Sequence, residues 1–264
     1  MKLLSRYPLF DSHLHIIDSY FPLIENDGYL PEEYLCEDYL QEMSEYNLCG
    51  GAIVSGSFQF YDQGYLIQAL NKLGKGFVGV TQLPIETTDQ EILALNEVGV
   101  RAVRFNLKRG GSETLNNLAS MAARVYELAG WHVELYLDSK DLASVYQILL
   151  KLPAFSIDHL GLSSKGLPLL MRLIEQGARI KASGFSRVDF EVKAALKEIY
   201  QINKHALMFG TDLPSTRAPT RYDANDFQLV EDTLGHQAAL NIFYLNAIGF
   251  YRPSKVPPND NLIM

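Results

Sequence analysis

Two histidines near the N-terminus, His13 and His15, are separated by one residue in the stretch Asp11-Ser12-His13-Leu14-His15. Side chains at positions i and i+2 of a strand point to the same face, so we expect both imidazoles and the Asp11 carboxylate to form one row. Two imidazoles that face one space can bind a metal ion or transfer a proton. The alternative is one core histidine and one surface histidine in a loop, and residues elsewhere in the chain must decide between the two.

More polar residues stand in or just after later apolar runs. His159 and Asp212 each follow such a run, and Arg104, Asn106 and Tyr136 alternate with apolar residues inside runs of their own. Taken singly, His159 could hold a backbone carbonyl and Asp212 could cap a helix. Buried polar groups cost free energy unless they are paired, so the convergence of several would be a poor arrangement for stability alone.

Short runs rich in Val, Ile and Phe alternate with longer helical patterns along the whole chain. The predicted strands are 9–15, 51–55, 77–83, 102–107, 133–138, 155–159, 179–183 and 207–212. The predicted helices are 31–46, 65–73, 89–98, 114–129, 140–150, 167–176 and 190–203, and two more, 226–234 and 236–248, follow the last strand. Pro31-Glu32-Glu33 and the segment 88–91 are typical helix starts.

Eight strands that are each followed by a helix predict a single α/β domain, a (β/α)8 TIM barrel over residues 1–264 with extra C-terminal helices. A doubly wound open sheet is the main alternative, but no Gly-x-Gly-x-x-Gly follows the first strand. Barrel closure would place the last strand beside the first. Asp212 should then lie near His13, His15 and His159 at the C-terminal ends of the strands, where such barrels carry their chemistry.

The composition narrows the class of partner. The chain has 264 residues, of which 47% are hydrophobic, and a formal net charge of −8. An acidic protein is not expected to bind nucleic acid or an anionic membrane surface. Its two cysteines fit no disulfide or zinc pattern, and no apolar stretch approaches the roughly 20 residues that span a membrane. We expect a cytoplasmic protein that binds a small molecule.

The His-x-His pair, His159 and Asp212 give the chain a resemblance to the amidohydrolase superfamily of metal-assisted hydrolases. Longer strings resemble the 2-pyrone-4,6-dicarboxylate lactonase branch and its sugar-lactonase relatives. These strings are residues 54–70, GVRAVRFN (99–106), GWHVELY (130–136), IDHLG (157–161), KASGFSR (181–187) and GTDLP (210–214). The resemblance implies a hydrolase that opens a lactone, a cyclic ester, of a small carboxylated or sugar-derived substrate.

Two positions depart from the lactonase pattern. Leu162 stands where those lactonases have an arginine, and Leu213-Pro214-Ser215 stands where they have Trp-Pro-His. A paired cation is how a site holds a second carboxylate, so the missing arginine argues against the pyrone dicarboxylate itself as the substrate.

The resemblance also bears on a metal. Superfamily members with two metals use a histidine at the end of the fifth strand or a lysine in the fourth, and neither is present. We therefore expect at most one divalent ion, zinc by preference, held by His13, His15 and Asp212. Because lactonases of this branch also work without a metal, no cofactor at all is the other expectation.

The expected mechanism follows from what ester hydrolysis needs, namely an activated water, a polarised carbonyl and a proton for the departing oxygen. Asp212 would take the proton from water and pass it to the ring oxygen. His13, His15 and His159 would polarise the carbonyl, directly or through one ion.

Four residues of the same mouth are expected to bind the substrate. Arg104 and Arg187 would hold a carboxylate, Arg104 through a bidentate fork, and Tyr136 and Asn106 would contribute hydrogen bonds. Arg217 and Arg221, in the loop after the last strand, are weaker candidates for the same role, and we interpret both as solvated.

Two other functions use the same barrel. A zinc-dependent, non-oxidative decarboxylase of an aromatic or muconate-type acid would need its metal and would release carbon dioxide. A non-catalytic binding barrel is the third hypothesis, and the presence of both His159 and Asp212 argues against it.

Overall fold

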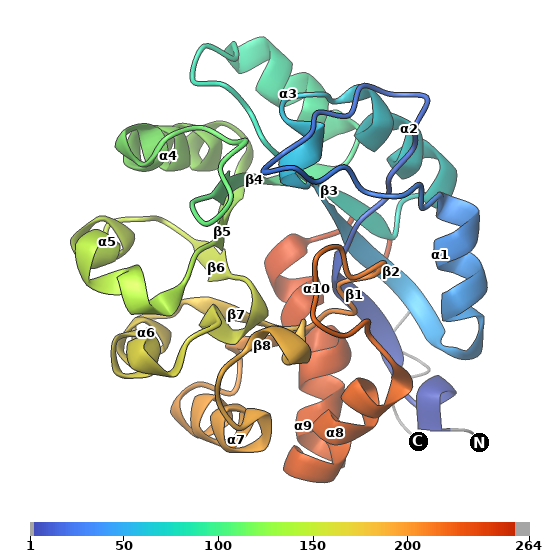
Figure 1. Ribbon diagram of the computed structural model, residues 1–264, viewed down its shortest axis with the longest axis vertical. Coiled ribbons are helices and arrows are strands. Elements are labelled where there is room, and N and C mark those ends of the chain that lie inside the picture. The colour runs from blue at the N-terminus through green and yellow to red at the C-terminus, as the bar shows by residue number, and fades with distance from the viewer. Residues whose placement is uncertain (1–2, 257–264) are drawn as a thin grey trace.

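The computed structural model describes residues 3–256. Eight parallel strands pair in the order of the sequence, and Figure 1 shows them as a ring surrounded by helices. The strands are β1 (Pro8–Leu14), β2 (Asn47–Val54), β3 (Phe77–Thr81), β4 (Val100–Asn106), β5 (His132–Tyr136), β6 (Phe155–Ile157), β7 (Arg179–Ala182) and β8 (Leu207–Phe209). The predicted (β/α)8 barrel is confirmed.

Helices α1 to α7 each connect one strand to the next, and α8 to α10 follow β8. They are α1 (Cys36–Glu42), α2 (Gly64–Leu73), α3 (Asp89–Glu97), α4 (Leu118–Ala129), α5 (Leu142–Leu149), α6 (Leu167–Glu175), α7 (Val192–Ile202), α8 (Ala224–Leu234), α9 (His236–Leu240) and α10 (Asn246–Tyr251). A π-helical turn, Asn241–Leu245, joins α9 to α10. Within residues 3–256, no helix has the length and apolar character to cross a membrane.

The two predicted helix starts have different outcomes. Thr88 and Glu91 exchange side-chain to backbone hydrogen bonds at the first turn of α3, so the start predicted there is confirmed. The start predicted at Pro31 is wrong, because α1 begins at Cys36. Tyr34 instead exchanges backbone hydrogen bonds of 2.8 and 2.7 Å with Ile17 in an isolated bridge, which holds this segment extended.

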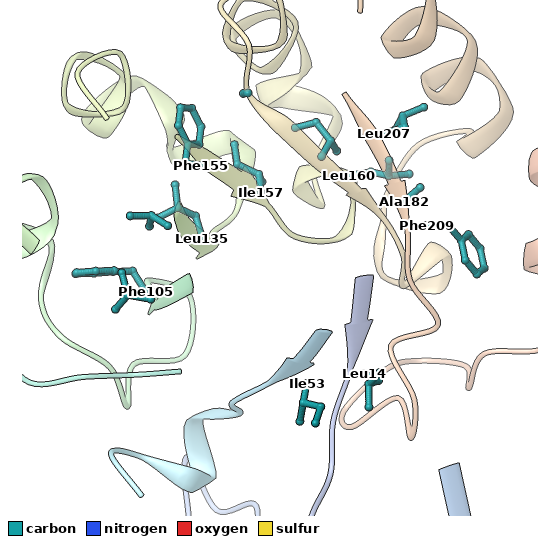
Figure 2. Packing of buried hydrophobic residues seen from close by; sticks show 14 of the residues in the cluster. Leu14, Ile53, Phe105, Leu135, Phe155, Ile157, Leu160, Ala182, Leu207 and Phe209 are labelled. Atoms are coloured by element: carbon teal, nitrogen blue, oxygen red, sulfur yellow. The ribbon is translucent and has the colours of Figure 1, made fainter. Parts of the chain in front are cut away.

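Apolar residues at alternate strand positions point outward and pack beneath the helices. Phe105, Leu135, Ile157 and Phe209 are fully buried in this layer (Figure 2). Full burial of one such side chain contributes about 1.5–3 kcal/mol. Because neighbouring residues in a strand face opposite sides, Arg104, which precedes Phe105, projects into the barrel. Packing of the outer layer thus determines which polar groups face the interior.

One end of the barrel is covered by the C-terminal helix. The ring of Tyr251 in α10 stacks on Phe10 of β1 with a centroid distance of 5.2 Å, and both are fully buried. They share an apolar cluster with Val78 and Met208, which lie in the strands at the same end. This cover leaves the C-terminal ends of the strands as the open mouth.

Candidate active site

The first and last strands meet at the mouth of the barrel. Asp212 donates its backbone N–H to the carbonyl of His13 at 2.7 Å, and His15 donates to the carbonyl of Leu213 at 2.8 Å. A Cβ at Gly210 would lie 2.7 Å from that of His13, so only glycine allows the two backbones this approach. The predicted adjacency of the first and last strands is therefore present, and it fixes Asp212 against the His-x-His pair.

Three imidazoles surround one oxygen of Asp212. The Nε2 atoms of His13, His15 and His159 lie 3.7, 3.7 and 3.9 Å from Asp212 Oδ1. All four side chains are buried. The structure thus brings together the four residues that the sequence singled out as catalytic, from the ends of three strands.

The backbone around this cluster departs from the predicted strands. Strands β6 and β8 end at Ile157 and Phe209, earlier than predicted, and His159 and Asp212 follow in left-handed conformations with φ of 50° and 60°. Such conformations cost on the order of 1–3 kcal/mol each in residues other than glycine, and they cluster at functional sites. Leaving the strand geometry turns both side chains toward the mouth.

The expected alignment of Asp11 with the two histidines is wrong. Its carboxylate accepts hydrogen bonds from the Thr211 backbone and hydroxyl at 2.9 and 2.6 Å and from the hydroxyl of Tyr39 in α1 at 3.1 Å. The register of β1 with β2 shifts between Asp11 and Leu14, so the simple alternation of faces is interrupted there. Asp11 therefore anchors the loop after β8 and does not enter the site.

Arg187 is bound to Asp212. Its Nε donates to Oδ2 of Asp212 at 2.8 Å, its Nη2 lies 2.6 Å from the same oxygen, and that Nη2 also donates to the Thr216 carbonyl. Burial acts to raise the pKa of Asp212, but the Arg187 guanidinium and the neighbouring imidazoles outweigh it and hold the pKa well below its usual range. Asp212 is therefore ionised.

Arg104 is held against Asp158 and keeps two nitrogen donors unused. Its Nη2 lies 2.9 Å from Asp158 Oδ2, and its guanidinium lies 5.8 Å from the centroid of the Tyr136 ring. Among residues 3–256, the Nε and Nη1 atoms of Arg104 have no hydrogen-bond partner. A buried guanidinium with unused N–H groups is suited to bind a carboxylate.

Below the mouth lies an ionic cluster that the sequence analysis did not assign to the site. Lys181 of β7 and Glu134 of β5 form a fully buried ion pair, and Tyr251 donates its hydroxyl to Glu134. Lys181 Nζ also lies 3.2 Å from Nδ1 of His13. Burial, followed by the charge of Lys181, lowers the pKa of His13 well below its usual value, so this imidazole is neutral. In the sequence, Lys181 alternates with apolar neighbours, and this pattern could have indicated that its side chain faces the barrel interior.

A cavity of about 410 Å³, a volume that includes its open mouth, lies at the C-terminal ends of the strands. The expected substrate-binding residues Arg104, Asn106, Tyr136 and Arg187 all contribute to its wall. His15, His159 and Asp212 line it too.

Two more arginines, Arg109 and Arg217, complete the wall. The interpretation of Arg217 as solvated is wrong. Its guanidinium lies 4.4 Å from the centroid of the Tyr29 ring and donates to the Asn26 carbonyl, which holds it over the cavity. The sequence analysis assigned no role to Arg109. Both arginines lie in loops that follow strands, β4 and β8, and this position in the sequence could have identified them as residues of the cavity.

The remaining histidines lie away from this cavity. His132 starts β5 and faces Glu134 at the covered end of the barrel, and His236 contacts the hydroxyl of Tyr7. The pocket wall contains neither.

Distances alone would allow a metal ion here. His13, His159 and Asp212 form a group whose ligand atoms lie within 4.8 Å of one another, with His159 in place of the expected His15. His13 Nε2 and Asp212 Oδ1 are buried and, within residues 3–256, have no hydrogen-bond partner, as atoms that face a ligand would.

The hydrogen bonds around this group oppose a metal. The Lys181 ammonium donates to Nδ1 of His13, which leaves the hydrogen of the neutral ring on Nε2, and a protonated Nε2 cannot bind a metal. Arg187 meanwhile holds the other oxygen of Asp212. The donor set as hydrogen-bonded does not fit a divalent ion.

Comparison with known proteins agrees with the fold. The profile of the amidohydrolase family matches residues 10–252. A 2-pyrone-4,6-dicarboxylate hydrolase of Comamonas testosteroni is 28% identical over 162 residues, which are 57% of this chain and 51% of that protein. The chain thus aligns with about half the length of this curated relative.

Solved structures share the barrel. A protein of Agrobacterium tumefaciens has a TM-score of 0.82 at 22% identity, over 96% of this chain and 99% of its own. A probable 2-pyrone-4,6-dicarboxylic acid hydrolase of Acinetobacter baumannii, with citric acid bound, has a TM-score of 0.79 at 23% identity, over 92% of this chain and 99% of its own. At these identities the likeness concerns the fold. Because the family profile covers nearly the whole barrel, the resemblance found in the motifs is confirmed, and the chain belongs to the amidohydrolase family of hydrolases.

Proposed function

We propose that this protein is a metal-independent lactonase that hydrolyses a small lactone carrying at least one carboxylate. The observation that carries the proposal is the cavity in which Asp212, His15 and His159 face a wall with four arginines, with His13 buried beside Asp212. A carboxylate base with hydrogen-bond donors suits ester hydrolysis, and the arginines suit an anionic substrate. The name of the Comamonas testosteroni relative, a hydrolase of a dicarboxylated pyrone, supports the same class.

In the proposed reaction Asp212 is the general base. Its Oδ1, which has no hydrogen-bond partner among residues 3–256, accepts a proton from the attacking water. Water oxygen bonds to the lactone carbonyl carbon, the ring C–O bond breaks, and the proton on Asp212 passes to the departing ring oxygen. The product is an open-chain hydroxy acid.

The imidazoles have different tasks in this mechanism. His13, with its hydrogen on Nε2, donates to the carbonyl oxygen where negative charge develops. His15 faces the Val54 carbonyl through Nδ1 at 2.7 Å, so this nitrogen carries the hydrogen and Nε2 can accept one from water. This division replaces the expectation that all three imidazoles polarise the carbonyl.

The ion pair with Arg187 links substrate binding to catalysis. A carboxylate whose pKa is held well below its usual range is a weak base. A substrate carboxylate that shares Arg187 would neutralise part of the positive charge beside Asp212 and thereby increase its basicity. An anionic lactone is thus expected to react faster than a neutral one of the same size, in addition to binding more tightly.

The decisive experiment is a proton-release assay over a panel of sugar lactones, muconolactones and pyrone dicarboxylates, with and without EDTA. We expect turnover of anionic lactones that EDTA leaves unchanged. Carbon dioxide release from aromatic or muconate-type acids that depends on zinc would replace the proposal with the decarboxylase alternative. Binding of these compounds without any turnover would instead favour a binding barrel.

A further inference from the structure

Lys181 lies inside the barrel, 168 residues away from His13 in the chain and in contact with it through space. Its side chain is fully buried and reaches from β7 toward the mouth. Its Nζ contacts three groups: Glu134 Oε2, His13 Nδ1 at 3.2 Å and Asp158 Oδ1 at 3.6 Å. Two carboxylates thus lie beside one ammonium group.

An ammonium has three hydrogens and no lone pair, so in its contact with His13 it can only donate. Nδ1 of His13 must then supply the lone pair, and the hydrogen of the neutral ring is on Nε2. Asp158 Oδ1, 3.4 Å from the same Nδ1, would favour the opposite tautomer. Within the described residues, however, that oxygen accepts no hydrogen bond, because the contact lacks the geometry.

We propose that Lys181 is a positioning residue that fixes His13 as the Nε2–H tautomer and so excludes a metal ion from the site. His13 Nε2 faces Asp212 Oδ1 at 3.7 Å, where the reacting carbonyl would be. The part of this inference that concerns the carbonyl rests on the proposed lactonase function. The tautomer of His13 and the exclusion of a metal ion are independent of that function.

His15 provides an internal contrast. Its Nδ1 faces a backbone carbonyl, Val54 O, which can only accept, so the hydrogen is on Nδ1 and Nε2 is free. Histidines that bind metals usually donate their second ring nitrogen in this way. Two histidines separated by one residue therefore have opposite tautomers, and the partner of Nδ1 accounts for the difference.

The first test reads the tautomers directly. We would record ¹⁵N NMR spectra of the wild-type protein labelled at histidine, at pH 7.5, and assign the rings with His13→Gln and His15→Gln variants. The expected result is an unprotonated Nδ1 and a protonated Nε2 in His13, with the reverse in His15. A protonated Nδ1 in His13 would overturn the proposal.

The second test removes the ammonium. Lys181→Met alone would leave Glu134 buried without its partner, so the variant to use is Lys181→Met with Glu134→Gln; Asp158 keeps Arg104. Lys193→Met, at an exposed position of α7, is the matched control. Circular dichroism establishes that each variant is folded.

In the double variant we expect three changes together. His13 takes up both tautomers, the affinity for Zn²⁺ in calorimetric titration rises about tenfold or more, and kcat for the lactone falls about 10- to 100-fold with little change in KM. An unchanged His13 tautomer and zinc affinity would overturn the positioning role. If no lactone is turned over by the wild type, the lactonase proposal fails, while the NMR and zinc readouts still decide the role of Lys181.

Discussion

Arg187 donates from Nε to Oδ2 of Asp212 across 2.8 Å, so the residue expected to bind a substrate carboxylate is bound to the expected base. The opposite oxygen of that carboxylate faces the three imidazoles. One carboxylate therefore joins the anion-binding half of the cavity to its hydrolytic half. Four predictions follow from this arrangement and from the groups that support it.

Replacing Arg187 by Met should move the acid limb of the activity profile to higher pH. Asp212 must be ionised to accept a proton, and removing the cation that depresses its pKa raises that pKa. We expect kcat/KM for a neutral lactone to begin falling at a pH at least about 1 unit higher than in the wild type. Arg221→Met, which removes a surface ion pair with Glu42, is the control. An acid limb that coincides with the wild type would contradict the coupling.

Replacing Asp212 by Asn should abolish turnover and leave the fold intact. An amide cannot accept the proton of the attacking water, and losses of about 10²–10⁴-fold are typical when a general base is removed. Steady-state kcat and far-ultraviolet circular dichroism measure the two effects. Retained activity in a folded variant would remove Asp212 from the mechanism.

Replacing Arg104 by Ala should raise KM for anionic lactones much more than for neutral ones, and it should also destabilise the protein. The second effect arises because Asp158 is fully buried and paired with Arg104 at 2.9 Å. Removing one partner of a buried pair costs about 3–5 kcal/mol, measured by urea unfolding. Arg104→Met with Asp158→Asn should recover part of this stability without recovering affinity for anions. Equal KM changes for both lactone classes would argue against the binding role.

Acid should destabilise the fold through His159. Burial lowers the pKa of its imidazole from the ordinary 6.5 to about 4, so this histidine is neutral in the folded protein. The contribution of this neutral histidine to the free energy of unfolding is fully present above pH 6.5. It is lost as the pH falls toward 4, because the unfolded chain then takes up a proton that the folded chain does not. The free energy of unfolding falls by about 2–3 kcal/mol for a pKa difference of roughly 2 pH units between the unfolded and folded states.

The comparison of wild type with His159→Gln isolates this contribution. Burial raises the pKa of Asp11 to about 6, so Asp11 has the opposite effect in the same range and stabilises the fold as the pH falls. That contribution is common to both proteins and cancels in the difference. Urea unfolding at pH 7.0 and 4.5 should show a smaller loss of stability in the variant; equal losses would contradict the prediction.

Local patterns determined the fold class and the membership of the site. The alternation of Arg104, Asn106 and Tyr136 with apolar residues indicated candidates for the site, and the Thr88–Glu91 pattern predicted the start of α3. Such patterns depend on neighbours two to four residues away, which the sequence displays directly. Barrel topology then sufficed to place Asp212 beside the His-x-His pair.

Only the tertiary structure decided how these groups are paired. The carboxylate of Asp11 turned away where the register of β1 shifts, and His159 and Asp212 follow their strands in left-handed conformations. The contact between Lys181 and His13 joins β7 to β1 across 168 residues. The tautomer of an imidazole depends on which donor or acceptor reaches each of its two nitrogens. The spacing of the strands across the barrel interior determines these contacts, and no pattern along the chain displays them.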